Sequence, residues 1–130
     1  MLLDTSGLFC VCFAEEPRHS LAVHAYKTAI RRLTHNYVLA EFIALANARG
    51  FDRRRAIGFV TAFALDSELK LIWVDRGLHQ RGMTLLQARL DKTYSLCDAI
   101  SFVLMSEQGI QEALTTDRHF EQEGFRRLLV

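Results

Sequence analysis

The segment YSLCDAISFVLM, residues 94–105, is the most apolar helix-like run of the chain. Its apolar residues recur at helical spacing, so one helix face is expected to be buried: Leu96, Ile100, Val103 and Leu104. The segment carries a single carboxylate, Asp98, near its start. A buried acid is costly unless it is paired, hydrogen-bonded or bound to a cation. Ser95 and Asp98 give one structural explanation, because their spacing predicts a capping box at the start of the helix.

Around this segment, short apolar runs alternate with helical patterns. Strands are expected at residues 1–3, 32–35, 69–74, 110–116 and 125–130, and helices lie between them in the pattern. Alternating strands and helices predict an α/β fold in which helices cover both faces of a parallel sheet. No linker or repeat interrupts the 130 residues, so a single domain over residues 1–130 is expected.

Several side chains are expected to face the core. Trp73 follows a strand pattern and is expected to be buried. In the helix after Asp52 the inward positions include Ile57 and Leu65, and in the helix over residues 79–90 they include Leu90. The phenylalanines near residues 51–63 either belong to the core or line a groove for a partner peptide or a second copy of the chain.

Composition excludes several classes of protein. The chain is 50% hydrophobic and 24% charged, with a net charge of +1, so it is neither disordered nor broadly basic. Its cysteines form no C-x-x-C pair, which argues against a disulfide framework or a thiolate zinc site. No segment suits a signal peptide or a membrane span, so a cytoplasmic protein is expected.

Four acids are expected to meet at one edge of the sheet. Asp4 and Asp117 each follow a strand, while Glu41 and Asp98 lie near the starts of helices. In a parallel α/β fold, the carboxyl ends of strands and the amino ends of the following helices share an edge, where ligands bind. Ser6 and Thr116 add hydroxyl groups there.

Clustered carboxylates repel each other, and a divalent cation removes the conflict. An all-oxygen site suits Mg²⁺ or Mn²⁺, which can activate a water molecule and offset charge on a phosphate. The residues therefore indicate metal-assisted hydrolysis of a phosphate ester. Each acid also has a structural explanation: Asp4 and Asp117 as helix caps, Glu41 as an acid in the first turns of its helix, and Asp98 in the capping box.

The chain resembles the PIN-domain ribonucleases, particularly the single-domain VapC-type toxins. Four blocks in the order typical of that family carry the resemblance: LLDTS at residues 2–6, LAEF at 39–42, SLCDAI at 95–100 and LTTDRHF at 114–120. The resemblance implies a three-layer Rossmann-like PIN fold with a parallel sheet of about five strands. It also implies an Mg²⁺- or Mn²⁺-dependent endoribonuclease, inhibited by an antitoxin protein.

Carried over by position, the resemblance makes four acids the catalytic residues: Asp4, Glu41, Asp98 and Asp117. Of these, Asp4, Asp98 and Asp117 are expected to bind the metal, with Ser6 and Thr116 in support. Arg118 and His119 are placed to meet RNA, and a homodimer is expected.

One residue departs from the family pattern. Some members carry a further acid two positions after the last motif acid, where this chain has His119. The departure leaves open a second interpretation, a PIN-like module that binds RNA or protein without cleaving. An aspartyl phosphatase of the haloacid dehalogenase type needs a second Asp two residues after the first, and Ser6 stands there instead.

Overall fold

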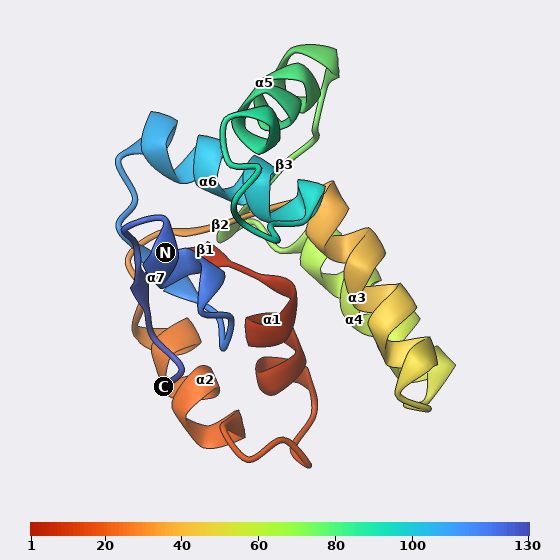
Figure 1. Cartoon of the computed structure of the whole chain (residues 1–130). Coiled ribbons are helices and arrows are strands. Elements are labelled where there is room, and N and C mark those ends of the chain that lie inside the picture. Colours follow the sequence, from red (N-terminus) through yellow and green to blue (C-terminus); the bar gives the residue numbers. More distant parts are fainter.

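The structure is a computed structural model that describes residues 1–130. At its centre is a parallel sheet of five strands in the order β3-β2-β1-β4-β5 (Figure 1). The strands are β1 (Leu2–Leu3), β2 (Arg32–His35), β3 (Leu69–Ile72), β4 (Glu112–Leu114) and β5 (Arg126–Arg127). The strand order reverses direction at β1, which makes the β1–β4 pair the topological switch point where α/β folds bind ligands.

Seven helices complete the expected α/β fold. The first group is α1 (Thr5–Cys12), α2 (His19–Thr28), α3 (Asn36–Ala48) and α4 (Arg53–Leu65). The second group is α5 (Arg76–Gln87), α6 (Leu96–Gln108) and α7 (His119–Gln122). The two groups lie on opposite faces of the sheet, so the molecule has three layers (Figure 1).

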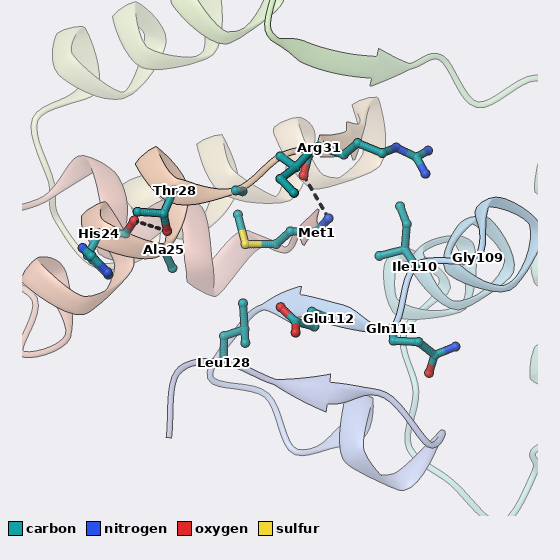
Figure 2. A pocket seen from close by; sticks show the side chains of 12 residues that line it. Met1, His24, Ala25, Thr28, Arg31, Gly109, Ile110, Gln111, Glu112 and Leu128 are labelled. Atoms are coloured by element: carbon teal, nitrogen blue, oxygen red, sulfur yellow. Dashed lines mark hydrogen bonds between the residues drawn. The ribbon is translucent and has the colours of Figure 1, made fainter.

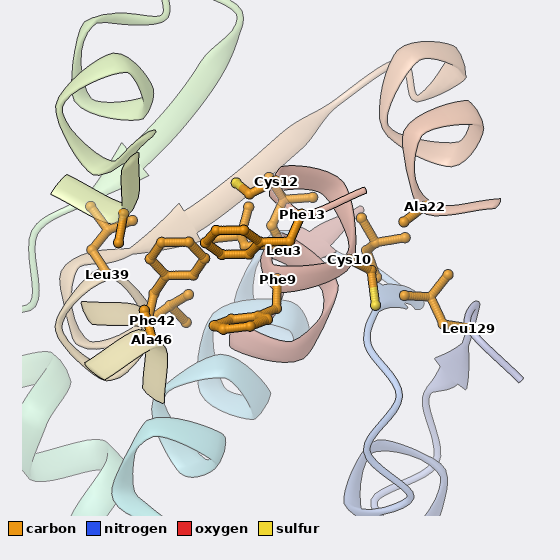
Figure 3. Packing of buried hydrophobic residues seen from close by; sticks show 14 of the residues in the cluster. Leu3, Phe9, Cys10, Cys12, Phe13, Ala22, Leu39, Phe42, Ala46 and Leu129 are labelled. Carbon is orange, nitrogen blue, oxygen red and sulfur yellow. The ribbon is translucent and has the colours of Figure 1, made fainter. Parts of the chain in front are cut away.

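Alternating strand residues explain how the sheet separates two cores. Leu3 and Leu114 point into a cluster with the aromatic side chains of α1 and α3 (Figure 3). Leu2 and Ala113, one residue earlier in the same strands, point into a second cluster built on α6. Because successive strand residues face opposite sides, two apolar residues in β1 are enough to join both layers.

The segment that carries Asp98 forms α6 as expected. The Ser95 hydroxyl accepts from the Asp98 N–H, and the Asp98 carboxylate accepts from the Ser95 N–H, so the predicted capping box is present. Ile100, Phe102 and Met105 are buried along this helix. Its end is a left-handed glycine, Gly109, whose positive φ stops the helix before β4.

Two expected inward positions of the fourth helix were wrong. Ile57 and Leu65 are 44% and 81% exposed, and only Ala56 is buried in α4. The reason is that α4 packs mainly against α3, and the two helices project together from the body of the molecule (Figure 1). A helix that packs mainly against one other helix buries a narrower stripe of side chains than a helix lying on a sheet.

Two further burial predictions were wrong. Leu90 is 86% exposed, because α5 ends at Gln87 and Leu90 lies in the turn that follows. Trp73 is 69% exposed, because β3 ends at Ile72 and the tryptophan begins the connection to α5. Phe59 and Phe63 are partly buried against the first core cluster. None of the helices is long and apolar enough to cross a membrane.

Candidate functional site

The site begins at the carboxyl end of β1, at the switch point of the sheet. Leu3 pairs with Leu114, and the N–H of Asp4 donates to the carbonyl of Leu114 at 3.2 Å, which holds Asp4 against β4. Asp4 is the N-cap residue of α1, but its side chain makes no capping bond. Its carboxylate, in a residue only 4% exposed, is therefore free to face the site.

Hydroxyl groups join Asp4 to the end of β4. Thr115 donates its hydroxyl to Asp4 Oδ2 at 2.7 Å, and the Thr115 hydroxyl oxygen accepts from the N–H of Asp117 at 3.0 Å. Ser6 lies 3.1 Å from the Thr115 hydroxyl and accepts from the N–H of Thr116 at 3.0 Å. One threonine therefore fixes both the Asp4 carboxylate and the backbone of Asp117.

A second group of side chains links α6 to α7. His119 Nδ1 lies 3.0 Å from Asp98 Oδ2 and 3.4 Å from Asp117 Oδ2. The possible ligand atoms of Asp98, Asp117 and His119 all lie within 4.8 Å of one another. Asp117 also accepts from the N–H of His119 at 2.9 Å, which fixes the turn between them. The other ring nitrogen of His119 lies 3.1 Å from the Thr93 hydroxyl.

The electrostatics of Asp4 connect these groups. Burial, followed by the nearby charges of Asp98 and Glu41, raises the pKa of Asp4 to about 7, although the Thr115 hydrogen bond opposes the shift. Burial together with Glu41, Asp4 and Asp98 also raises the pKa of the Cys97 thiol. Glu41 is exposed on α3, yet its charge acts on the same buried groups. Three of the four predicted acids, Asp4, Glu41 and Asp98, therefore share one electrostatic environment.

No cationic side chain neutralises these acids. Every Lys and Arg ion pair in the molecule involves other carboxylates, and His119 is the only basic group in contact with Asp98 and Asp117. Clustered carboxylates without a cation favour a divalent metal with oxygen ligands, to which an imidazole can be added. The residues present thus fit a divalent cation, because ligand atoms of Asp98, Asp117 and His119 lie within 4.8 Å of one another and the charge of Asp98 raises the pKa of the buried Asp4 carboxylate.

Most of the predicted side chains are in direct contact in the structure, and one residue that was not predicted, Thr115, joins them. Thr115, rather than Thr116, supplies the hydroxyl that touches Asp4; Thr116 contributes its N–H to Ser6 and its carbonyl to Arg127. The sequence carries no signal for this choice, because the point at which β4 ends and its register with β1 place Thr115 level with Asp4. Arg118 is exposed and its side chain has no partner.

The largest cavity, of about 630 Å³, lies elsewhere. Its lining includes residues just before β1 and β2 and at the start of β4, so it opens at the amino edge of the sheet, opposite the acids (Figure 2). There the Met1 ammonium group donates to the carbonyl of Arg31 at 2.9 Å, and burial lowers the pKa of that ammonium. Cavity size therefore does not locate the acidic site.

Comparisons with known proteins agree with this geometry. A family profile described as the PIN domain matches residues 1–125. The chain is 31% identical over 127 residues to the 23S rRNA-specific endonuclease VapC20 of Mycobacterium tuberculosis strain CDC 1551, with 96% of this chain and 95% of the relative covered; the protein of strain H37Rv gives the same values. The crystal structure of the M. tuberculosis VapC20 toxin, described as cleaving the sarcin-ricin loop, superposes with a TM-score of 0.86 at 29% identity, covering 95% of each chain.

Proposed function

This chain belongs to the PIN domain family and is a ribonuclease toxin of the VapC type, and on that premise we propose how its residues act. The family match supports the nuclease and not the non-catalytic module. We propose that the chain hydrolyses RNA phosphodiester bonds with Mg²⁺ or Mn²⁺. The observation that carries this proposal is the cluster of acids at the switch point of the sheet, which no Lys or Arg neutralises.

Each acid has a proposed role. Asp4, Asp98 and Asp117 hold the cation, and Glu41 completes the acidic set from α3. A bound divalent cation activates a water molecule and stabilises the charge that develops on the phosphate oxygens. Ser6 and Thr116 support the end of β4, and the Thr115 hydroxyl holds Asp4 in place at 2.7 Å.

His119 gives this chain its own variation of the family site. The imidazole contacts both Asp98 and Asp117, so it orients their carboxylates before a cation binds. Groups that orient metal ligands in this way contribute substantially to metal affinity and activity. Arg118 lies next to Asp117 with its guanidinium exposed, which suits a contact with a phosphate of the RNA.

The RNA target is proposed from the relative. M. tuberculosis VapC20 is named a 23S rRNA-specific endonuclease, and its structure is described as that of a toxin that cleaves the sarcin-ricin loop. We propose ribosomal RNA as the substrate of this chain, and an oligonucleotide with that loop is the first substrate to test. A toxin that acts on ribosomal RNA would work in the cytoplasm.

Protein partners are also proposed. VapC-type toxins are paired with an antitoxin, and we propose that this chain binds one and forms a homodimer. The exposed apolar side chains on α4, Ile57 and Leu65, support a protein contact on the projecting α3–α4 pair.

The test compares wild type with Asp98→Asn on labelled RNA, with and without Mg²⁺. The asparagine keeps an oxygen that can accept the capping hydrogen bond but removes the charge, so cleavage is expected to fall by at least about 100-fold while the fold is retained. Asp91→Asn is the matched control, because Asp91 is exposed and pairs only with Lys92. Cleavage that needs no divalent cation, or that survives Asp98→Asn, would contradict the proposal.

A further inference from the structure

Three arginine side chains make no hydrogen bond or ion pair in the molecule: Arg54, Arg76 and Arg118. The other arginines each contact a carboxylate, a carbonyl or a side-chain amide. Two of the three free side chains lie at the carboxyl edge of the sheet, since Arg76 follows β3 and Arg118 follows β4. Arg118 adjoins the acidic site, because it stands between Asp117 and His119, and Arg76 lies farther along the same edge, next to β3.

An exposed tryptophan lies on the same edge. Ile72 pairs with His35, and Leu33 pairs with Leu2, so continuing the register places Ile72 level with Asp4. Trp73 is the next residue, and it is 69% exposed. β3 is two positions from β1 in the sheet order, and adjacent strands lie about 4.8 Å apart, so the backbones of Trp73 and Asp4 are separated by roughly 10 Å.

The connection that carries Trp73 is fixed at both ends. The N–H of Val74 donates to the side chain of Asn36 at 2.6 Å, which ties the connection to the start of α3. The Asp75 carboxylate caps α5 by accepting from the N–H of Leu78 at 2.8 Å. Trp73 is therefore an exposed aromatic side chain on a short, anchored segment. Single exposed apolar side chains are common, but this one is a large ring beside an unpaired arginine, Arg76, at the edge of the sheet that carries the acids.

We propose that Trp73 stacks on an unpaired base of the RNA substrate, one or two nucleotides from the scissile phosphate, while Arg76 contacts the adjoining phosphate. The inference rests on the proposed function, because it concerns the same substrate. Exposed aromatics beside free cations are the combination that binds single-stranded RNA, since bases stack on the ring and cations hold the backbone. The two free arginines at this edge, Arg76 and Arg118, favour a polyanion over a protein partner there.

The chain offers a direct probe, because Trp73 is its only tryptophan. A short unstructured RNA oligonucleotide is titrated into the full chain carrying Asp98→Asn, with Mg²⁺ present, so that binding occurs without cleavage. Stacking is expected to quench the tryptophan fluorescence with the same midpoint as the anisotropy of the labelled RNA. Inorganic polyphosphate, which has the charges but no bases, should compete for binding without quenching.

Two sets of variants complete the experiment. Trp73→Ala is expected to weaken RNA binding about tenfold, and Trp73→Phe should retain most of the affinity because a ring remains. The positional control moves the tryptophan in a Trp73→Phe, Ile30→Trp double variant. Ile30 is fully exposed just before β2, at the opposite edge of the sheet, so RNA should leave that fluorescence unchanged.

The outcomes separate the two proposals. If RNA binds without quenching, or if Trp73→Ala binds as tightly as the parent, the stacking inference is wrong and the nuclease proposal stands. If Trp73→Ala alters the molecular mass measured by light scattering, Trp73 is a contact between copies of the chain and the inference is overturned. If the wild-type chain neither binds nor cleaves RNA, both proposals fail.

Discussion

At the scale of single residues, Asp4 is a carboxyl group whose ionised form is unfavourable in the folded protein. The residue is 4% exposed and near Asp98 and Glu41, which together with burial raises its pKa from 3.8 to about 7. An ionised carboxylate in this position is disfavoured unless a cation joins it. The fold is therefore expected to be less stable at alkaline pH without metal than it would be with a neutral side chain.

We expect Asp4→Asn to raise the free energy of unfolding at pH 8 in EDTA by on the order of 1–3 kcal/mol. The reason is that wild type must lose the Asp4 proton near pH 7 when folded but near pH 3.8 when unfolded, so folding becomes less favourable as pH rises between these values. Urea denaturation at pH 5 and pH 8 measures the change, and the gain should be smaller at pH 5.

Added Mg²⁺ should reverse the order of stability of wild type and Asp4→Asn. Added Mg²⁺ is expected to raise the melting temperature of wild type and to leave Asp4→Asn nearly unchanged, because the variant lacks one ligand charge. The exposed Asp91→Asn variant serves as the control. Equal stabilisation of wild type and Asp4→Asn by Mg²⁺ would mean that Asp4 does not contribute to a cation site.

At the scale of elements, the contact between α1 and β4 decides how close the two halves of the site can lie. A Cβ added at Gly7 would lie 1.9 Å from the carbonyl oxygen of Leu114, so the helix approaches the strand backbone at this point. That approach brings Asp4 and Ser6 to the level of Thr115. Only glycine allows it, because both partners at the contact are backbone.

Gly7→Ala is accordingly expected to lower the free energy of unfolding by roughly 3 kcal/mol or more, since neither backbone can move without breaking the core. Gly58→Ala is the matched control: a Cβ there meets nothing within 4 Å, and alanine in the exposed helix α4 should stabilise by about 0.5–1 kcal/mol. Chemical denaturation of the two variants tests the contrast. A Gly7→Ala variant with the same free energy of unfolding as wild type would show that α1 does not approach the backbone of β4 this closely.

At the scale of the whole molecule, two buried groups give the stability opposing pH dependences. His35 joins β2 to α6 through Ser101 at 2.8 Å, and burial lowers the pKa of its imidazole from 6.5 to about 3. The unfolded chain binds a proton at His35 below pH 6.5 and the folded chain does not, so this group makes stability rise with pH. Asp4 has the opposite effect over the same range.

We therefore expect the free energy of unfolding to depend on pH with different slopes in His35→Gln and Asp4→Asn, measured between about pH 4.5 and 6. His35→Gln keeps only the effect of Asp4, so its stability should fall as pH rises. Asp4→Asn keeps only the effect of His35, so its stability should rise with pH. Each group contributes about 1.4 kcal/mol per pH unit, so the two slopes should differ by about twice that. Parallel curves for the two variants would contradict the assignment.

Much of this architecture could be predicted from the sequence. Alternating strands and helices gave the parallel sheet, and strand-end acids gave the edge at which Asp4, Asp98 and Asp117 lie. The capping box of Ser95 and Asp98 was also readable, because it depends on residues three positions apart. Features that depend on short-range sequence patterns, such as strand–helix alternation and helix capping, can thus be predicted from the sequence.

Features that depend on distant partners were harder to predict. The exposure of Ile57 and Leu65 follows from α4 packing mainly against α3, and an amphipathic pattern does not tell what a helix packs against. Thr115, and not the predicted Thr116, donates its hydroxyl to Asp4, because the exact end of β4 determines which threonine faces the acid. Trp73 follows its strand by one residue, and boundaries of short strands are rarely marked in sequence.

The double engagement of Asp98, whose Oδ2 accepts from both the Ser95 N–H and the His119 ring, has a consequence for genetics. Cells that survive forced production of this toxin should yield two kinds of lesion at the Asp98 codon. Asparagine leaves a folded, harmless protein that accumulates and still engages its partners. Alanine also removes the hydrogen bond from the Ser95 N–H, which is one half of the capping box and worth about 1 kcal/mol, and so lowers the amount of protein. Immunoblots of survivors would sort the two classes, and only the first would act as a decoy for the antitoxin.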